Sequence, residues 1–270
     1  MQNNKKLNNY IDGGLRCEGN IKKSSVNSPL ITVVTVVYNG EKFLDKTIES
    51  VIKQDYNNLE FIIVDGGSTD YTINIIKKYE DEIDYWISEK DEGIYDAMNK
   101  GLTLANGDWI YYLGADDTLK NFSDEIKNAL KNKEVDIILG TVNAISSEGV
   151  RLLPRVQVNN SSCFYWKSLG WPHQGQIIRK EKHTGFDKEY KLIADNKLLL
   201  MLYRKKAKTF ISRDVIANYS LEGISTLNKS QRLKEWKKLF SFFDVNTVPQ
   251  SICDRFWFFV RKIQIKVLEA

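Results

Sequence analysis

Residues that form disulfides and hold transition metals are scarce in this sequence. Among its 270 residues there are three cysteines, Cys17, Cys163 and Cys253, and two histidines, His173 and His183. An odd number of widely separated cysteines fits neither a disulfide framework nor a CxxC metal site, so we expect a reducing, cytoplasmic environment. Two histidines are too few for a metal site built from several of them.

Long apolar runs and nucleotide-loop motifs are missing as well. No segment has the roughly 18 consecutive apolar residues of a membrane-spanning helix, and residues 1–14 lack the apolar core of a signal peptide. The sequence contains no GxGxxG and no P-loop motif, which argues against both kinds of nucleotide site. The net charge of +4 is too small to predict a nucleic-acid partner. We therefore expect a protein that is neither exported nor membrane-spanning.

Short apolar segments alternate with amphipathic ones over residues 29–120. Runs rich in β-branched and aromatic residues, typical of buried strands, lie within residues 29–40, 59–65, 84–88 and 108–114. A helical pattern follows each of the first three runs, and Asn39 is a candidate cap for the first helix. This alternation predicts an α/β fold with a mostly parallel sheet flanked by helices.

The pattern changes in the second half of the chain. We expect a hairpin over residues 144–154, a strand over 174–180, a helix over 194–206 and β structure over 208–220. Residues 1–28 are polar, and we interpret them as an N-terminal arm. The predicted divisions that follow are a domain, residues 29–225, with halves 29–120 and 121–225, and an amphipathic helical extension, residues 226–270.

Polar residues collect where the predicted strands end. In parallel α/β sheets, ligands bind beyond the carboxyl ends of the strands, and Asn39, Asp65 and the pair Asp116-Asp117 all follow strands. Mg²⁺ and Mn²⁺ take one or two carboxylates from protein and their other oxygens from phosphate and water. The pair therefore predicts a divalent-cation site that bridges a diphosphate, with ordinary turn chemistry as the alternative.

Three further positions permit two interpretations each. Asp65 either caps the turn that follows it or accepts hydrogen bonds from a nucleobase. In the segment WPHQGQ, His173 and Gln174 either have a structural role or face a sugar or phosphate. Asp195 begins an apolar helix, where an aspartate is either a cap or, when half-buried, a general base.

Four segments carry a resemblance to a known family. Two are long, ITVVTVVYNGEKFLDKTIESVIKQDYNNLEFIIVDGGSTDYT and SEKDEGIYDAMNKGLTLANGDWIYYLGADD, and two shorter ones follow, PHQGQIIRK and YKLIADNKLLLML. In this order they resemble the family 2 glycosyltransferases, which are inverting nucleotide-sugar enzymes of the GT-A fold. The resemblance is specific over residues 29–120 and weaker from there to residue 222.

The resemblance implies donor-side roles for the matching residues. Thr35, Tyr38 and Asn39 line the nucleotide pocket in this interpretation, and Asp65 contacts the base, typically uracil. Further donor contacts are implied for Asp91, Gly93, Asn99 and Asp116.

The resemblance also implies a cation site and a base. Asp116 and Asp117 hold Mg²⁺ or Mn²⁺, although the family motif reads D-x-D-D and this chain has Gly114 in place of the first aspartate. His173 and Gln174 belong to the acceptor or phosphate side. Asp195 falls where the family places its catalytic base.

The implied function is the inverting transfer of one sugar from a nucleotide-sugar, expected to be UDP-linked. The expected acceptor is a glycan or polyprenyl-linked saccharide in the synthesis of a bacterial surface polysaccharide. Asp195 removes the acceptor proton, and the cation stabilises the departing nucleotide. The chain lacks the QxxRW motif and the membrane spans of processive synthases, which favours single-sugar transfer. A sugar nucleotidyltransferase and a non-catalytic scaffold on a degenerate transferase fold are the alternatives.

The C-terminal segment, residues 228–270, is basic and aromatic. Apolar residues share one face of its predicted first helix, namely Leu233, Trp236, Leu239, Phe240 and Phe243. This face either packs on the core or lies on an anionic membrane surface, which would place the protein at the inner face of the cell membrane.

Overall fold

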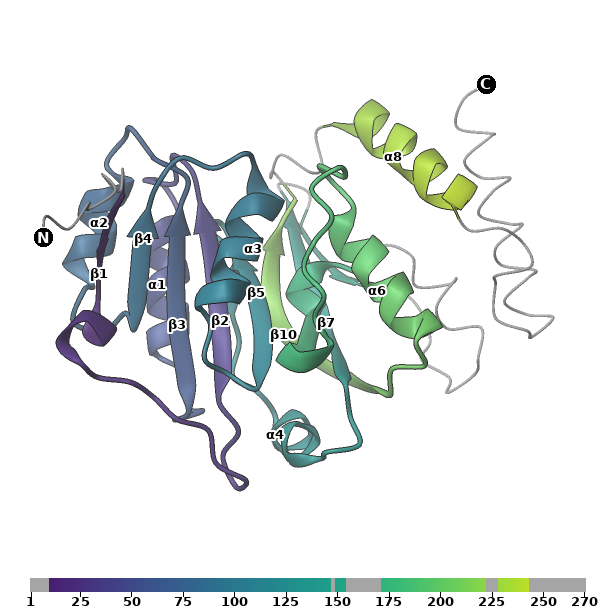
Figure 1. Ribbon diagram of the computed structural model, residues 1–270, viewed down its shortest axis with the longest axis horizontal. Helices are drawn as coiled ribbons and strands as arrows, with labels where there is room; N and C mark the ends of the chain where they lie inside the picture. Colours follow the sequence, from purple (N-terminus) through teal and green to yellow (C-terminus); the bar gives the residue numbers. More distant parts are fainter. Residues whose placement is uncertain (1–9, 147–148, 154–170, 222–227, 243–270) are drawn as a thin grey trace, which may run out of the picture.

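One mixed sheet of ten strands runs through the computed structural model, which describes residues 10–146, 149–153, 171–221 and 228–242. The strand order is β1-β4-β3-β2-β5-β9-β7-β10-β6, and β8 pairs with β7 outside this path. Helices cover both faces of the sheet, so the chain forms three layers (Figure 1). The predicted α/β fold class is confirmed.

The first half of the sheet is built from parallel strands. They are β2 (Ile31–Val37), β3 (Leu59–Asp65), β4 (Tyr85–Ser88) and β5 (Trp109–Gly114). β2 and β3 are buried along their whole length, which explains their continuous apolar sequences. Val37 pairs with Asp65 and Val36 pairs with Gly114, so β2, β3 and β5 end at the same edge of the sheet.

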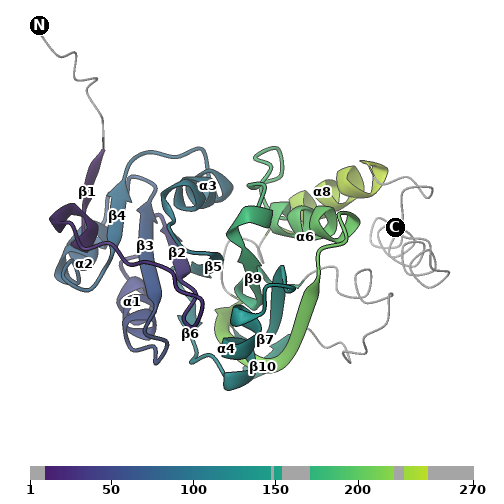
Figure 2. The ribbon, with the colours of Figure 1, turned by 60° about the horizontal axis from the view of Figure 1, so that its bottom comes forward.

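Each face of the sheet has its own helices and its own apolar cluster. The helices on one face are α1 (Leu44–Ile52), α2 (Thr72–Lys78) and α4 (Asp124–Lys131). On the other face lie α3 (Ile94–Leu104), α6 (Ala194–Arg204) and α8 (Lys229–Phe242), as Figure 2 shows. Successive side chains of β2 point to opposite faces of the sheet, so Val33 belongs to the first cluster and Val34 to the second.

The helix after β2 begins later than the predicted cap. Phe43 occupies the N-cap position of α1 and makes no side-chain cap. Asn39 has a left-handed backbone with φ of 52°, which asparagine tolerates better than most residues. Its Oδ1 accepts a 2.9 Å hydrogen bond from the Thr69 N–H. The capping prediction is therefore wrong, because Asn39 joins the loop after β2 to the loop after β3.

The second half of the sheet mixes directions. β7 (Ile137–Ser146) and β8 (Gly149–Leu153) form the predicted hairpin. The predicted strand β9 (Gln176–Arg179) lies between β5 and β7 and is antiparallel to both. Two short 3-10 helices flank it, η2 (His173–Gly175) and η3 (Lys180–Lys182). Because β9 runs against β5, the residues that precede β9 lie at the edge where β5 ends.

The far side of the sheet consists of β10 (Thr209–Ser220) and the short strand β6 (Thr118–Leu119). β10 runs parallel to β7, and near its end it pairs antiparallel with β6. Ala217 and Asn218 face Leu119 and Thr118 in this pairing. The end of β10 therefore returns to the loop that follows β5.

The N-terminal segment is not a separate arm over its described residues. β1 (Ile11–Gly13) pairs antiparallel with β4, and η1 (Leu15–Glu18) follows it. Arg16 Nη1 donates to the Leu104 carbonyl at 2.8 Å, and Lys22 Nζ lies 2.9 Å from Asp84 Oδ2. The polar composition therefore misled the prediction, because polar side chains attach this segment to the sheet edge. Residues 1–9 lie outside the described chain.

The described part of the C-terminal extension packs on the core. Leu239 and Phe240 of α8 are buried in the same cluster as α6. Glu235, which is 4% exposed, accepts hydrogen bonds from the backbone N–H groups of Lys191 and Leu192. The packing interpretation therefore holds for α8, and residues 243–270 lie outside the described chain. In the part that the structure describes, no helix combines the length and apolar character that crossing a membrane requires.

Candidate active site

The loops after β2 and β3 are bonded to one another at the sheet edge. The Asn39 N–H donates to Ser68 Oγ at 2.7 Å, and the Gly40 N–H donates to Thr72 Oγ1 at 2.8 Å. Tyr38 is 64% exposed beside these bonds. A rigid double loop with an exposed aromatic ring is a surface on which a nucleobase can stack, which is the place predicted for the nucleotide.

Thr35, which was predicted to line the nucleotide pocket, lies inside the protein. It is fully buried, and it shares the α1 face of β2 with Val33 and Val37. Within the described residues its Oγ1 has no hydrogen-bond partner. Its role in the nucleotide pocket stays a prediction.

Asp65 shows the turn-capping interaction that was one of its two interpretations. Its Oδ2 accepts hydrogen bonds from the N–H groups of Gly67 and Ser68, at 3.0 and 2.9 Å, and from Ser88 Oγ at 2.6 Å. Oδ1 accepts from the Ser68 hydroxyl. The carboxylate is fully buried and organises the turn. Contact with a base stays a prediction.

The loop before α3 reaches the same edge. The Gly93 N–H donates to Asp91 Oδ1 at 2.8 Å, and a Cβ on Gly66 would collide with the Asp91 carboxylate. Gly93 has φ of 118° in open space, which favours glycine at the start of α3. The predicted donor residues Asp91 and Gly93 are therefore brought beside the turn after β3.

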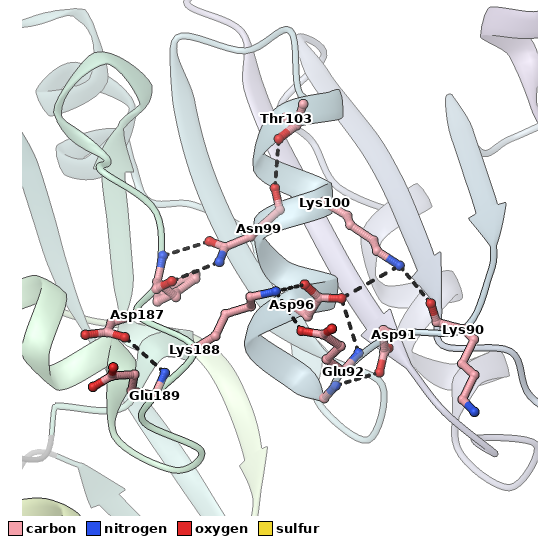
Figure 3. A network of polar contacts seen from close by, with 12 residues as sticks. Lys90, Asp91, Glu92, Asp96, Asn99, Lys100, Thr103, Asp187, Lys188 and Glu189 are labelled. Atoms are coloured by element: carbon pink, nitrogen blue, oxygen red, sulfur yellow. Dashed lines mark hydrogen bonds and ion pairs between the residues drawn. The ribbon is translucent and has the colours of Figure 1, made fainter.

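Side chains of α3 and of the loop before it hold the segment that leads to α6, as Figure 3 shows. Lys188 Nζ lies 2.8 Å from Glu92 Oε2 and 2.9 Å from Asp96 Oδ1. Asn99 Nδ2 donates to the Phe186 carbonyl at 2.9 Å, and the Phe186 N–H donates to Asn99 Oδ1 at 2.7 Å. Asn99 thus clamps the backbone of a neighbouring segment, and its predicted contact with the donor stays a prediction.

Asp116 and Asp117 follow β5 in very different surroundings. Asp117 is 1% exposed, whereas Asp116 is exposed. Asp117 Oδ2 accepts from Gln174 Nε2 at 2.6 Å and from the Gly114 N–H at 3.2 Å, and Oδ1 accepts from the Ser220 N–H at 2.9 Å. Burial, together with the charge of Asp116, raises the pKa of Asp117 to about 7.

Helix α1 holds the loop after β5 through the side chain of Thr47. Thr47 is fully buried, and its Oγ1 lies 2.7 Å from the carbonyl oxygens of both Ala115 and Asp117. The hydroxyl donates to this pair of carbonyls, so the backbone of the loop is fixed to the rigid core. The exposed Asp116 carboxylate therefore projects from a loop that α1 and β10 both restrain.

Steric crowding explains why Gly114 stands where the family motif has its first aspartate. A Cβ on Gly114 would lie 2.5 Å from Asp117 Oδ2 and 3.1 Å from Asp116 Oδ1. Asp117 Oδ2 cannot move away without losing its bonds to Gln174 and Gly114. A side chain at this position is therefore incompatible with the observed orientation of Asp117.

The carboxylate oxygens of Asp116 and Asp117 fit a hard divalent cation bound through one or two protein ligands. Mg²⁺ and Mn²⁺ prefer carboxylate oxygens and complete their coordination with substrate phosphate and water. Within the described residues there is no group of three or more His, Cys, Asp or Glu side chains placed to hold a metal ion. Asp117 already accepts hydrogen bonds from Gln174, Gly114 and Ser220, whereas Asp116 is exposed, and cation binding by either residue stays a prediction.

Two consecutive residues connect this loop to Asp195. Gln174 binds Asp117, and the Tyr111 hydroxyl donates to the Gln174 carbonyl at 2.8 Å. His173 Nδ1 lies 3.8 Å from Asp195 Oδ2. His173 Nε2 is buried and has no hydrogen-bond partner among the described residues. Burial lowers the pKa of His173 to about 4, so its ring is neutral at pH 7.

Asp195 lies in the first turn of α6 and is 7% exposed. It provides no cap, because Ile193 occupies the N-cap position without a side-chain hydrogen bond. The Tyr95 hydroxyl donates to Asp195 Oδ1 at 3.0 Å. Burial raises the pKa of Asp195 to about 6, although the bond from Tyr95 acts in the opposite direction. A carboxylate with a pKa near 6 is well matched to proton abstraction at neutral pH.

Sequence reasoning missed Tyr95, Thr47 and Ser220. Tyr95 and Asn99 are four residues apart on α3, a spacing that puts both on one helix face and could have flagged them as a pair. Thr47 and Ser220 offered no comparable signal, because their partners lie 70 and 103 residues away in the sequence.

Comparisons with known proteins agree with this architecture. The family model described as glycosyl transferase family 2 matches residues 32–206. A PGL/p-HBAD biosynthesis glycosyltransferase of Mycobacterium tuberculosis is 35% identical over 95 residues, which are 34% of this chain and 37% of the relative. An uncharacterized glycosyltransferase of Haemophilus influenzae is 38% identical over 99 residues, 36% of this chain and 40% of the relative. The chain thus spans less than half of either relative.

Two solved structures share the fold. S. aureus TarS 1–349 in complex with UDP-GlcNAc has a TM-score of 0.64 at 20% identity, over 83% of this chain and 67% of that one. The mannosyltransferase PcManGT from Pyrobaculum calidifontis, in complex with GDP-Man and Mn²⁺, has a TM-score of 0.61 at 17% identity, over 84% of this chain and 68% of that one. The expected GT-A fold is confirmed. Because the family match over residues 32–206 covers more than half of the 270 residues, the chain belongs to glycosyl transferase family 2.

Proposed function

We propose that this chain transfers a single sugar from a UDP-sugar to a hydroxyl of a glycan or lipid-linked saccharide, with inversion at the anomeric carbon. The transfer contributes to the synthesis of a bacterial surface polysaccharide. One observation carries the proposal: the consecutive residues His173 and Gln174 lie against Asp195 and Asp117, respectively. These contacts link the buried carboxylate of Asp195 to the loop that bears Asp116, which supports its proposed role as the base.

The chemistry follows from this placement. The Asp195 carboxylate takes the proton of the acceptor hydroxyl as the acceptor oxygen bonds to the anomeric carbon. The bond from that carbon to the phosphate oxygen breaks, and its electron pair leaves with the nucleoside diphosphate. A base on one side of the sugar and a leaving group on the other produce inversion.

Asp116 would hold the divalent cation, with Asp117 and Gln174 fixing the loop that carries it. A bound Mg²⁺ or Mn²⁺ would supply positive charge that stabilises the diphosphate as a leaving group. Neighbours of the same fold support a nucleotide-sugar donor and a divalent cation, since one is a complex with UDP-GlcNAc and the other a complex with GDP-Man and Mn²⁺. Tyr38 and the turn held by Asp65 receive the nucleobase in this proposal.

Thermal unfolding against nucleotides tests the donor class. The purified protein is measured with UDP, GDP, TDP and CDP, each with Mn²⁺ and with EDTA. Ligand at a hundredfold excess over its dissociation constant stabilises the folded state by about 2.7 kcal/mol. We expect a higher midpoint with UDP that EDTA and the Asp116→Ala change both abolish. Folded protein that responds to no nucleotide would contradict the proposal and favour the scaffold alternative.

Asp195→Ala separates this proposal from the nucleotidyltransferase alternative. A nucleotidyltransferase needs no base on the acceptor side, so it keeps its activity after this change. If the chain is instead the proposed sugar transferase, Asp195→Ala abolishes sugar transfer while UDP binding persists.

We also propose that residues 228–270 contact an anionic membrane surface. Leu239 and Phe240 are buried against the core, so α8 contacts the membrane through its exposed lysines, Lys234, Lys237 and Lys238. Flotation with vesicles that contain anionic lipid, with and without residues 228–270, tests this contact. Equal flotation of both forms would exclude it.

A further inference from the structure

Tyr95 connects α3 to the start of α6. Its hydroxyl donates to Asp195 Oδ1 at 3.0 Å across 100 residues of sequence. The two residues are 6% and 7% exposed, so little water competes for this bond. An ionised carboxylate can only accept, and burial raises the pKa of Tyr95 far above its usual value, so the phenol is the donor at neutral pH.

Neighbouring groups fix the position of the Tyr95 ring. Its centroid lies 5.2 Å from that of Phe186. Asn99, one helical turn further along α3, binds both backbone groups of Phe186. The phenol is therefore held in place before any substrate binds.

The second oxygen of Asp195 faces His173. Oδ2 lies 3.8 Å from His173 Nδ1, which is too far for a hydrogen bond. Among the residues that the structure describes, the titratable side chains that approach the carboxylate from the packed elements are Tyr95 on α3 and His173 on η2. Both are uncharged at neutral pH, since burial raises the pKa of the first and lowers that of the second.

We propose that Tyr95 is a positioning residue for the base, holding Oδ1 so that Oδ2, beside His173, meets the acceptor hydroxyl. This inference rests on the proposed function. The acceptor proton passes to Oδ2, the acceptor oxygen bonds to the anomeric carbon, and the electron pair of the broken bond leaves with the diphosphate. Tyr95 exchanges no proton with the substrate.

Tyr95→Phe keeps the ring and removes the donor. We expect kcat to fall about tenfold, a part of the roughly 10²- to 10⁴-fold effect of a general base, with the KM for the donor unchanged. The phenol stabilises the ionised carboxylate, so its loss raises the pKa of Asp195 above about 6. The acidic limb of the pH–rate profile then moves to higher pH by about one unit. The assay measures nucleotide release from UDP-GlcNAc, UDP-glucose and GDP-mannose with Mn²⁺, with water and p-nitrophenyl glycosides as acceptors.

Tyr112→Phe is the matched control. The Tyr112 hydroxyl donates to the Met98 carbonyl at 3.2 Å, and its ring lies 5.1 Å from the same Phe186 ring. Its change therefore also removes one buried phenol bond beside α3, but this bond does not involve Asp195. We expect a lower unfolding midpoint with an unmoved acidic limb.

A double-mutant cycle tests the contact without substrate. Urea unfolding is measured for the wild type, Tyr95→Phe, Asp195→Asn and the double variant. The raised pKa of Asp195 gives stability that is complete below the unfolded value of about 3.9 and is lost as pH rises through about 6. Tyr95→Phe raises the folded-state pKa further, so this loss continues to higher pH. We expect strong coupling at about pH 8, where the carboxylate is charged, and weaker coupling at about pH 5.

Each outcome decides the proposal. A coupled cycle with a shifted acidic limb supports it. An uncoupled cycle, or a coupled cycle with an unmoved limb, overturns it. Coupling in a protein that releases no nucleotide from any donor overturns the proposed function and the positioning role with it. If Tyr95→Phe does not fold, a fluorinated tyrosine at position 95 donates more strongly and should move the limb to lower pH; an unmoved limb again overturns the proposal.

Discussion

The two carboxylate sites on the shared sheet edge are built in opposite ways. Asp117 accepts hydrogen bonds from Gly114, Gln174 and Ser220, and it orders the loop from which the exposed Asp116 projects. Asp195 is held from another helix by Tyr95. The Asp117 site is a turn at the end of β5 that residues from other elements stabilise. The Asp195 site, in contrast, forms by the contact between α3 and α6.

This difference separates binding from chemistry. Changes at the β5 loop should act on cation and nucleotide affinity or on stability, depending on which aspartate is altered. Changes at the α3–α6 contact should act on turnover. The five predictions that follow test this division, beginning with the largest effect.

Asp195→Asn should abolish sugar transfer. The amide has nearly the shape of the carboxylate but cannot take the acceptor proton, so we expect turnover to fall by roughly 10²- to 10⁴-fold. Nucleotide release is the readout, and the Mn²⁺-dependent midpoint shift with UDP serves as the binding control. Turnover that survives in the folded variant would remove Asp195 as the base.

Asp116→Ala and Asp117→Ala should have different consequences. Asp116 is exposed, so its change should leave the free energy of unfolding within about 0.5 kcal/mol and remove the Mn²⁺-dependent response to UDP. Asp117→Ala strands the buried amide of Gln174 and should cost about 2–3 kcal/mol. Urea unfolding and the nucleotide shift measure both effects. The opposite pattern would make Asp117 the cation ligand.

Gly114→Asp restores the family motif but should not strengthen cation binding. The new Cβ would lie 2.5 Å from Asp117 Oδ2, and relieving this clash should lower the free energy of unfolding by about 1–3 kcal/mol. Gly114→Ala, which adds the same Cβ without a charge, should cost a similar amount. A gain in Mn²⁺ affinity, measured by calorimetry with UDP present, would show that the loop adapts.

Asn99→Ala should lower stability without weakening nucleotide binding. It removes both hydrogen bonds to the Phe186 backbone, which predicts a loss of about 1–3 kcal/mol. Thr103→Ala on the exposed side of the same helix is the control and should change stability by no more than about 0.5 kcal/mol. A higher dissociation constant for UDP-sugar, at an unchanged free energy of unfolding, would support the predicted donor contact.

Lys188→Met should have the smallest effect. Lys188 is 46% exposed, and solvent screens its ion pairs with Glu92 and Asp96. We expect urea unfolding of this variant to match that of the wild type, because exposed ion pairs contribute little to stability. A clearly lower urea midpoint would show that the cluster in Figure 3 acts as a cooperative network.

Local pattern predicted the parallel half of the molecule well. β3 has the predicted bounds, and β2, β4 and β5 lie within the predicted segments, because a strand buried on both faces must be apolar throughout. The edge shared by Asp65 and the Asp116-Asp117 pair followed from that parallel order. Composition was a poorer guide at the N-terminus, where a polar segment pairs with β4.

The sequence by itself determined most of the elements and the family, and it predicted the candidate site residues. These depend on periodicity and on motifs whose members are close together in the chain. Only the tertiary structure decided which role each polar group plays: Asn99 as a backbone clamp, Gly114 as space for Asp117, and Tyr95 as the partner of Asp195. A hydrogen bond across 100 residues leaves no local pattern, because its two ends become neighbours only after the sheet and the helices on its face have packed.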